Sequence, residues 1–198
     1  MAIKLDMRKA CDWVEWAYLE AMMRKLGFQE RWIDLMMMCV TTVSYSMLIN
    51  GKPKGRIIPT HGLRQGDPIS LYLFHLCAEG LSAMLKKVEN GGIPRGIAVC
   101  RQAPLVSHLL FADDCILFGK VSKEEGLRLL KILEVYERES GQKLNREKTS
   151  LFFSKNTSVE VKEEVKDMFR AQIIHQHEYY LGLPLWWGKE RRKHSTVS

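Results

Sequence analysis

Two adjacent acids, Asp113 and Asp114, interrupt the otherwise apolar stretch "LLFADDCILFG" at residues 109–119. Two carboxylates about 4 Å apart repel by about 1 kcal/mol in water and by about 4 kcal/mol in a partly screened protein site. A hairpin turn is the plainest explanation, because Asp tolerates the backbone angles that turns require. A third acid favours a second explanation, since Asp6 ends the first alternating apolar stretch, "AIKLDM", in a similar setting.

Carboxylates gathered at two strand ends are what a two-metal site needs. Mg²⁺ prefers oxygen ligands and keeps coordination positions open for substrate phosphates. Two such ions stabilise the attacking and the leaving oxygens of an in-line phosphoryl displacement. We therefore expect Asp6, Asp113 and Asp114 to bind divalent cations that offset their mutual repulsion. Asp12 competes with Asp6 for this role, but its position predicts a helix N-cap instead.

Composition narrows the class of protein. The 198 residues are 46% hydrophobic and 27% charged, which suffices for one globular domain with its own core. The net charge of +7 favours polyanionic partners, and nucleic acid first among them. Five scattered cysteines without a C-x-x-C pair predict reduced intracellular thiols rather than a zinc site or a disulfide framework. Neither a signal peptide nor a membrane span is predicted, because charged or polar residues interrupt the apolar stretches.

The spacing of apolar residues predicts the elements that must position the acids. A strand ends at Asp6, and a helix over 12–28 begins at the N-cap Asp12, with Glu15 completing a capping box and Gly27 closing the helix. The remaining elements are a helix over 29–41, a hairpin turning at Asn50-Gly51, a buried helix over 68–88, strands over 97–101 and 106–119, a helix over 122–139, a loop running into a strand over 140–154, and a helix over 157–169. Helices over one face of a sheet make this an α+β arrangement, with a domain over 1–188 and a polar basic tail over 189–198.

Five stretches stand in a fixed order along the chain: "KLDMRKACDWVEW", "GLRQGDPIS", "HLLFADDCILFG", "SGQKLNREKTSLFF" and "YLGLPL". In this order they resemble the palm motifs of reverse transcriptases, and most closely those of LINE-type (non-LTR) retrotransposons of the plant kind. The resemblance implies a ferredoxin-like polymerase palm, which is an antiparallel sheet with helices packed on one face. It also implies RNA-directed DNA polymerase chemistry, with an RNA template, a DNA primer and deoxynucleoside triphosphates as partners. The implied cofactors are two Mg²⁺ ions, which Mn²⁺ can replace.

The resemblance also assigns roles in the chemistry to single residues. It assigns metal binding to Asp6, Asp113 and Asp114, with the carbonyl of Met7 completing a metal shell. It places Lys148, in "LNREK", beside the triphosphate, where this lysine would protonate the leaving pyrophosphate.

Contacts to the nucleotide and the nucleic acid are implied in the same way. The incoming nucleotide and the template base would meet Cys11, Gly62, Arg64, Gln65, Gly66 and Phe111. The two glycines in this set admit a close backbone approach. The hairpin that supports the primer end would consist of Tyr180, Leu181, Gly182, Leu183 and Pro184.

Three positions depart from the family pattern. Cys11 replaces the Tyr or Phe that packs under the incoming sugar and excludes a 2′-hydroxyl, Leu71 replaces a common Pro, and Trp13 replaces a residue that is usually polar. The first motif stands almost at the start of the sequence. We therefore expect a truncated fragment without fingers and largely without a thumb, which leaves open that a separate chain supplies the fingers.

Two alternatives to an active polymerase stay open. A catalytically inactive, retrotransposon-derived relic would retain at most non-specific nucleic-acid binding, which weakens steeply with salt. A nucleotide cyclase with a related palm is a more distant alternative, and "GLRQGDP" argues against it. The resemblance implies an intracellular protein without a membrane anchor, in the nucleus more than in the cytoplasm, with "KERRK" at 189–193 as a weak basic signal.

Overall fold

The computed structural model describes residues 1–90, 96–98, 100, 103–111, 114–174, 179–180 and 183–184. The helices in these ranges are α1 (Trp16–Lys25), α2 (Glu30–Thr41), α3 (Pro68–Asn90), α4 (Lys123–Ser140) and α5 (Val159–Phe169). The strands are β1 (Ala2–Arg8), β2 (Tyr45–Ile49), β3 (Lys52–Ile57), β4 (Ile97–Ala98), β5 (Leu105–Val106), β6 (His108–Phe111), β7 (Asp114–Phe118), β8 (Lys143–Leu144), β9 (Ser150–Phe152), β10 (Gln172–Ile173), β11 (Tyr179–Tyr180) and β12 (Leu183–Pro184).

Strand β1 is the centre of the main sheet. The strand order is β10-β9-β1-β7-β6, and the short β8 pairs with the end of β1. Neighbouring strands are antiparallel except for β10 and β9. Strands β1, β6, β7 and β9 with helices α3 and α4 give the connectivity β-α-β-β-α-β, in which the two halves of each βαβ unit are separated by a strand of the other. The predicted combination of a sheet with helices is confirmed, although the sheet is mixed and not purely antiparallel.

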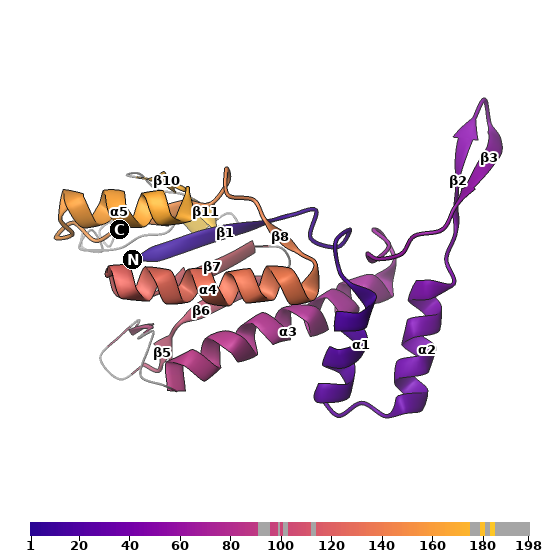
Figure 1. Ribbon diagram of the computed structural model, residues 1–198, viewed down its shortest axis with the longest axis horizontal. Coiled ribbons are helices and arrows are strands. Elements are labelled where there is room, and N and C mark those ends of the chain that lie inside the picture. The colour runs from indigo at the N-terminus through magenta and orange to yellow at the C-terminus, as the bar shows by residue number, and fades with distance from the viewer. Residues whose placement is uncertain are drawn as a thin grey trace, which may run out of the picture.

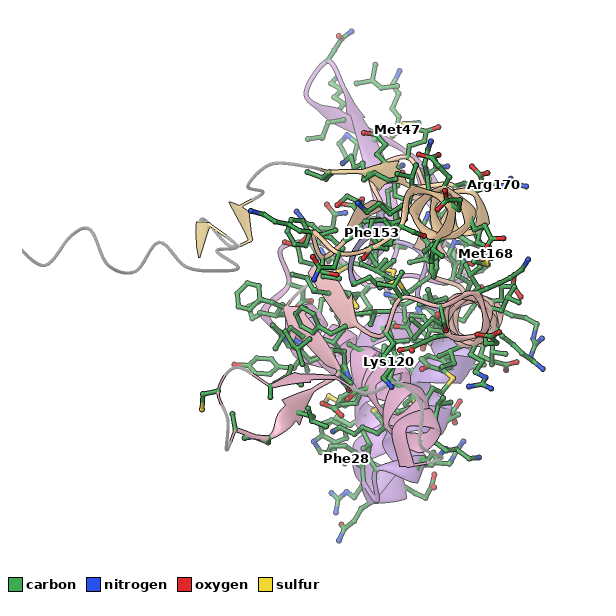
Figure 2. All side chains as sticks on the ribbon, turned by 90° about the vertical axis from the view of Figure 1, so that its left-hand side faces the viewer. Phe28, Met47, Lys120, Phe153, Met168 and Arg170 are labelled. Carbon is green, nitrogen blue, oxygen red and sulfur yellow. The ribbon has the colours of Figure 1, made fainter. Side chains whose placement is uncertain are left out.

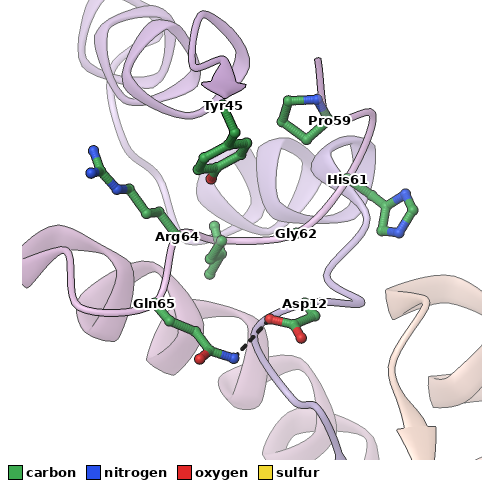
Figure 3. Close-up of a pocket in the computed structure, with 8 residues that line it drawn as sticks. Asp12, Tyr45, Pro59, His61, Gly62, Arg64 and Gln65 are labelled. Carbon is green, nitrogen blue, oxygen red and sulfur yellow. Dashed lines mark hydrogen bonds between the residues drawn. The ribbon is translucent and has the colours of Figure 1, made fainter. Parts of the chain in front are cut away.

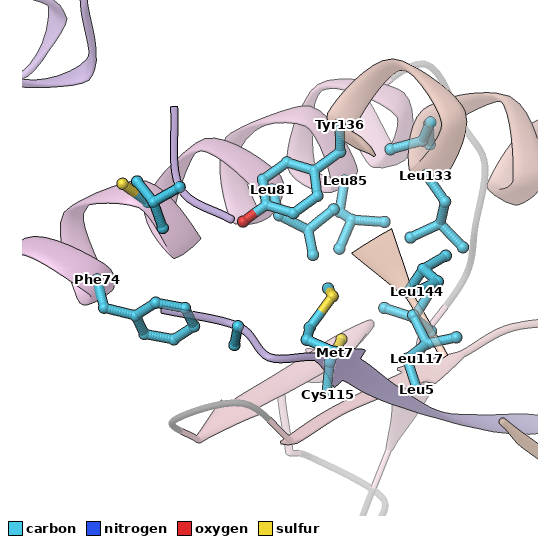
Figure 4. Packing of buried hydrophobic residues seen from close by; sticks show 14 of the residues in the cluster. Leu5, Met7, Phe74, Leu81, Leu85, Cys115, Leu117, Leu133, Tyr136 and Leu144 are labelled. Carbon is cyan, nitrogen blue, oxygen red and sulfur yellow. The ribbon is translucent and has the colours of Figure 1, made fainter. Parts of the chain in front are cut away.

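Helices α3, α4 and α5 lie against one face of this sheet (Figures 1 and 2). Along β1, Ile3, Leu5 and Met7 are buried toward these helices, whereas the residues between them are partly exposed. This alternation is expected of a strand with one covered face, because successive side chains point to opposite sides. Figure 4 shows Tyr136 of α4 and Leu81 of α3 directed toward Met7 across the layer between helices and sheet. Asp6 therefore projects from the other, uncovered face.

Helix α1 begins later than predicted. Its first residue is Trp16, and the N-cap position is occupied by Glu15, which makes no side-chain cap bond. The prediction that Asp12 caps this helix is wrong, because the segment before it is fixed by a contact distant in sequence. The Leu63 N–H donates to the Cys11 carbonyl at 2.8 Å. Leu63 lies in a loop some fifty positions further along the chain. The local capping pattern therefore could not indicate this bond.

Helix α3 is only partly buried. It packs against α1, α4 and β6 with Leu73, Cys77 and Leu81 in the core. Leu71 and Tyr72, on its other side, are 53% and 70% exposed. The prediction of a helix buried all round is therefore wrong, because a helix lying on one face of a sheet has an outer side that nothing covers. By length and composition alone Pro68–Val88 is apolar enough to cross a membrane, a test that core helices also pass.

The region around the paired acids contains more and shorter strands than the sequence predicts. The strand expected over 106–119 is two antiparallel strands, β6 and β7, with Phe111 opposite Asp114. Of the strand expected over 97–101, the described residues include β4, which pairs with β5 in a separate sheet, whereas positions 99 and 101 lie outside the described residues. Asp114 thus stands at the end of a hairpin, as the turn explanation requires, whereas positions 112–113 lie outside the described residues.

Strands β2 and β3 form a hairpin that projects away from the helices (Figure 1). Its turn residues Asn50 and Gly51 both have positive φ, 51° and 73°. This confirms the predicted Asn-Gly turn, since two positive φ angles give the twist that a two-residue hairpin needs. Every residue of both strands is exposed. The hairpin therefore adds nothing to the hydrophobic core.

A buried carboxylate, Glu125, lies in the first turn of α4. Ser122 caps the helix by accepting the Glu125 N–H at 3.2 Å, and Glu125 Oε1 accepts the Lys120 N–H at 2.8 Å. The side chain is 5% exposed, and desolvation raises the pKa of Glu125 although nearby positive charges oppose this shift. The folded chain then binds this proton more tightly than the unfolded chain does. Ionisation of Glu125 therefore lowers stability as the pH rises from the ordinary glutamate pKa through the raised one.

We expect Glu125→Gln to raise the melting temperature at pH 8 and to change it much less at pH 4, below the ordinary glutamate pKa, where the Glu125 carboxyl is largely protonated. Glutamine keeps an oxygen for the Lys120 N–H but carries no charge to desolvate. Thermal unfolding followed by circular dichroism at several pH values measures the difference. Glu124→Gln, at the exposed neighbouring position, is the control. A Glu125→Gln effect that is the same at both pH values would contradict the assigned cause.

Candidate active site

Asp6 and Asp114 are directly opposite each other in the pairing of β1 with β7. Residues opposite each other in a sheet have their side chains on the same face, so both carboxylates lie on the face that the helices do not cover. The Asp6 carbonyl accepts the Asn145 N–H at 2.8 Å, on the side of β8. Asp6 and Asp114 are therefore a non-hydrogen-bonded pair, for which Cα atoms are typically about 4.5 Å apart. Like charges at such a position are destabilising.

The structure places the other residues predicted for metal binding only in part. Asp113 lies outside the described residues. The Met7 side chain is buried. The carbonyl of the preceding residue, Asp6, faces β8. Because successive carbonyls of a strand point to opposite edges, the Met7 carbonyl faces the edge where β7 begins. Phe111 is 56% exposed and pairs with Asp114, which puts its side chain on the same uncovered face.

Asn145 is a site residue that the sequence did not indicate. Besides the backbone bond, its Nδ2 donates to Asp6 Oδ2 at 3.2 Å. Its Oδ1 is shielded from solvent and has no hydrogen-bond partner among the described residues. A buried acceptor left without a partner costs about 1–3 kcal/mol. The only hint in the sequence is that Asn145 stands three positions before Lys148, in a stretch that looks like a loop.

These groups suit a hard divalent cation. They are two carboxylates, a carbonyl directed at the same strand end and an unpartnered amide oxygen, which are the oxygen donors that Mg²⁺ and Mn²⁺ accept. Among the described residues no group of three or more His, Cys, Asp or Glu side chains is close enough to hold a metal by itself. The third carboxylate of the predicted set, Asp113, is not among them.

Lys148 is held near Asp6 through Asn145. The Lys148 N–H donates to the Asn145 carbonyl at 3.1 Å, and the Thr149 N–H donates to the same oxygen at 3.0 Å. Thr149 adds its hydroxyl to that carbonyl at 2.9 Å and is buried. The Lys148 side chain itself is exposed. The turn therefore anchors the backbone of this lysine while leaving its ammonium group in solvent.

The "HGLRQGDP" loop forms one wall of a pocket of about 470 Å³ (Figure 3). Gly62 has a φ of +88°, and a Cβ there would lie 2.6 Å from the carbonyl oxygen of Asp12. Gln65 Nε2 donates to Asp12 Oδ1 at 2.9 Å, which gives Asp12 a role other than the predicted cap. Arg64 is exposed and makes no ion pair within the described part of the chain. Gly66 has a φ of +83° with open space around it.

Cys11 lies in the segment that follows β1 and contacts this loop. It is half-buried against the core, and its carbonyl holds the loop through the Leu63 N–H. Trp13, two positions on, is 40% exposed and stacks on His61 with ring centroids 5.8 Å apart. Since residues 9–14 connect the end of β1 to α1, the acids and the pocket lie at the same end of β1.

The predicted primer-supporting hairpin is present in its described residues. Tyr180 pairs with Leu183, and Tyr179 with Pro184, in antiparallel register. Leu181 and Gly182 lie outside the described residues. These strands form a sheet of their own, and within the described ranges no strand pairing joins them to the main sheet. The structure thus shows the hairpin without placing it at the acids.

We expect Gly62→Ala to destabilise the fold more than Gly66→Ala. Both substitutions put an L-residue at positive φ, at a cost of about 1–2 kcal/mol. Only Gly62→Ala also drives a methyl group into the Asp12 backbone, so its free energy of unfolding should fall by roughly 1 kcal/mol or more beyond that of Gly66→Ala. Urea unfolding of the two variants beside the wild type measures this difference, and equal losses would contradict the close contact.

Comparison with known proteins supplies the family. Residues 1–185 match the family model described as reverse transcriptase (RNA-dependent DNA polymerase). The chain is 30% identical over 115 residues to a retrovirus-related Pol polyprotein from type-1 retrotransposable element R2 of Popillia japonica, and 38% identical over 128 residues to the corresponding protein of Nasonia vitripennis. These alignments cover 58% and 63% of this chain but only 18% and 11% of those proteins.

A shorter relative comes from a plant. The chain is 51% identical over 67 residues to the uncharacterized mitochondrial protein AtMg01250 of Arabidopsis thaliana, an alignment covering 34% of this chain and 55% of that protein. The family model spans most of the chain, from β1 through the β11–β12 hairpin. The chain therefore belongs to the reverse transcriptase (RNA-dependent DNA polymerase) family.

Proposed function

We propose that this chain is the ferredoxin-like palm of a reverse transcriptase, in which Asp6, Asp113 and Asp114 hold two Mg²⁺ ions for nucleotidyl transfer. The observation that carries the proposal is the Asp6–Asp114 pair at the end of the central strands. Two facing carboxylates lower stability unless something positive lies between or beside them. Membership of the family and the β-α-β-β-α-β connectivity support the same conclusion.

In the proposed reaction one P–O bond forms and one P–O bond breaks, and the proton of the 3′-hydroxyl passes to solvent. The 3′-hydroxyl oxygen of a DNA primer attacks the α-phosphorus of a deoxynucleoside triphosphate, and the bond to the pyrophosphate oxygen breaks. When bound, the cations stabilise the charge on the attacking and leaving oxygens. Lys148 is the group proposed to give a proton to the leaving pyrophosphate, because its exposed ammonium is tethered through Asn145 to Asp6.

The pocket beside the acids is proposed to receive the incoming nucleotide and the template base. Arg64 offers a cation without an internal ion pair in the described residues, and Gln65 offers an amide already fixed by Asp12. Cys11, in the segment that follows β1, and Phe111, at the end of β6 opposite Asp114, are proposed to complete this region. We propose that the Tyr180–Pro184 hairpin supports the primer end.

The implied partners are an RNA template and a DNA primer. The net charge of +7 favours them, since Lys and Arg side chains bind phosphates without reading sequence. Similarity to proteins from R2 elements supports an origin in a LINE-type retrotransposon, and similarity to an Arabidopsis protein supports a plant one. Action on nucleic acid inside the cell, in the nucleus above all, follows from this proposal.

Divalent cations should stabilise the folded chain. At a concentration of about 100 times Kd, Mg²⁺ or Mn²⁺ should add about 2.7 kcal/mol, which raises the melting temperature by roughly 5–10 °C in a chain of this size. Asp6→Asn and Asp113→Asn should each abolish this increase. Asp34→Asn, at an exposed acid on α2, should retain it. An equal increase in all three variants would end the metal-site assignment.

Primer extension on a poly(rA)/oligo(dT) duplex tests the activity itself. We expect extension that requires Mg²⁺ or Mn²⁺ and is lost in Asp113→Ala, provided that the variant gives the circular dichroism spectrum of the wild type. A chain that binds cations but extends no primer would contradict polymerase activity. It would favour the alternative of a retrotransposon-derived fragment, whose salt-dependent nucleic-acid binding would then be measured.

A further inference from the structure

Asn145 contacts Asp6 from the edge of β1 opposite to Asp114. One contact joins the Asn145 N–H to the Asp6 carbonyl, and the other joins Asn145 Nδ2 to Asp6 Oδ2. The first contact fixes the backbone, and the second fixes the rotation of the carboxylate. Asp6 is thus held from β8 on one side and faces Asp114 of β7 on the other.

The second carboxylate oxygen of Asp6 is left available by this arrangement. Asp6 Oδ1 has no hydrogen-bond partner in the part of the chain that the structure describes. Asn145 Oδ1 is also without a partner there, although it is shielded from bulk solvent. The free Asp6 Oδ1 is an acceptor of the kind that a hard divalent cation prefers.

The Asn145 backbone is independently fixed. Its carbonyl accepts bonds from the N–H groups of Lys148 and Thr149 and from the Thr149 hydroxyl. None of these bonds involves the Asn145 side chain. A substitution of that side chain therefore removes the contact with Asp6 while leaving the turn its backbone bonds.

We propose that Asn145 is a positioning residue, which orients the Asp6 carboxylate for cation binding through the bond from its Nδ2 to Asp6 Oδ2. This inference rests on the proposed metal site and assigns it a residue outside the acid set. Groups that orient a ligand from behind typically change metal affinity 10–100-fold when they are removed. Asn145 connects this role to Lys148, so one residue ties the cation site to the proposed proton donor.

The test measures Mn²⁺ binding from the electron paramagnetic resonance signal of the free ion. Asn145→Ala should raise the Mn²⁺ Kd about tenfold. Asn145→Asp keeps the shape but places a carboxylate against Asp6, so its melting temperature in EDTA should fall below that of the wild type. Because added negative charge favours the cation, Mn²⁺ should raise the melting temperature of Asn145→Asp more than that of the wild type. Its Mn²⁺ Kd should be no weaker.

A purely structural role would give a different pattern, in which both variants melt lower by amounts that do not depend on Mn²⁺. Asn156→Ala, at an exposed asparagine in the loop after β9, is the matched control and should behave as the wild type. A Kd within twofold of the wild type in Asn145→Ala, or no extra Mn²⁺ response in Asn145→Asp, overturns the proposal. If Asp6→Asn abolishes Mn²⁺ binding while the Asn145 variants leave it unchanged, only the role of Asn145 fails. Absence of Mn²⁺ binding by the wild-type chain overturns the metal site as well.

Discussion

The central position of β1 is the constraint on which the rest of the structure depends. One edge of this strand pairs with β7, and the other pairs with β9 and β8. One face contributes Ile3, Leu5 and Met7 to the core, and the other carries Asp6. A slip of one residue would exchange the two faces, because side chains alternate strictly along a strand. The apolar pattern that builds the core therefore also fixes which carboxylate meets Asp114.

This arrangement lets the fold carry a repulsive pair. Burial of a large aliphatic side chain contributes about 1.5–3 kcal/mol, and several such side chains line the covered face of β1 and β7. Repulsion between two partly solvated carboxylates is of the order of 1–4 kcal/mol. Burial in the core can thus offset the repulsion without a cation, and a cation bound as proposed would relieve it. The position of the two acids is thus determined by apolar residues on the opposite face of the sheet.

Features that depend only on residues close together in the sequence could be predicted from it. The Asn50-Gly51 turn needs only residues a few positions apart, and the structure has it. The cap at Asp12 was wrong because its segment bonds to a loop far along the chain. Local sequence could not indicate the role of Asn145 for the same reason, since its partner, Asp6, is 139 positions away. Pairings across such separations are set by the sheet register, which no single stretch of sequence contains.

The β2–β3 hairpin has a consequence for how the chain opens. A two-stranded ribbon with no buried side chain has little stability of its own, so its amide hydrogens should exchange with solvent on a much shorter timescale than those of β1. Segments of low local stability open without unfolding the core. A protease would accordingly cut between Tyr45 and Ile57 while the main sheet remains intact. The β2–β3 hairpin is therefore expected to open independently of the main sheet.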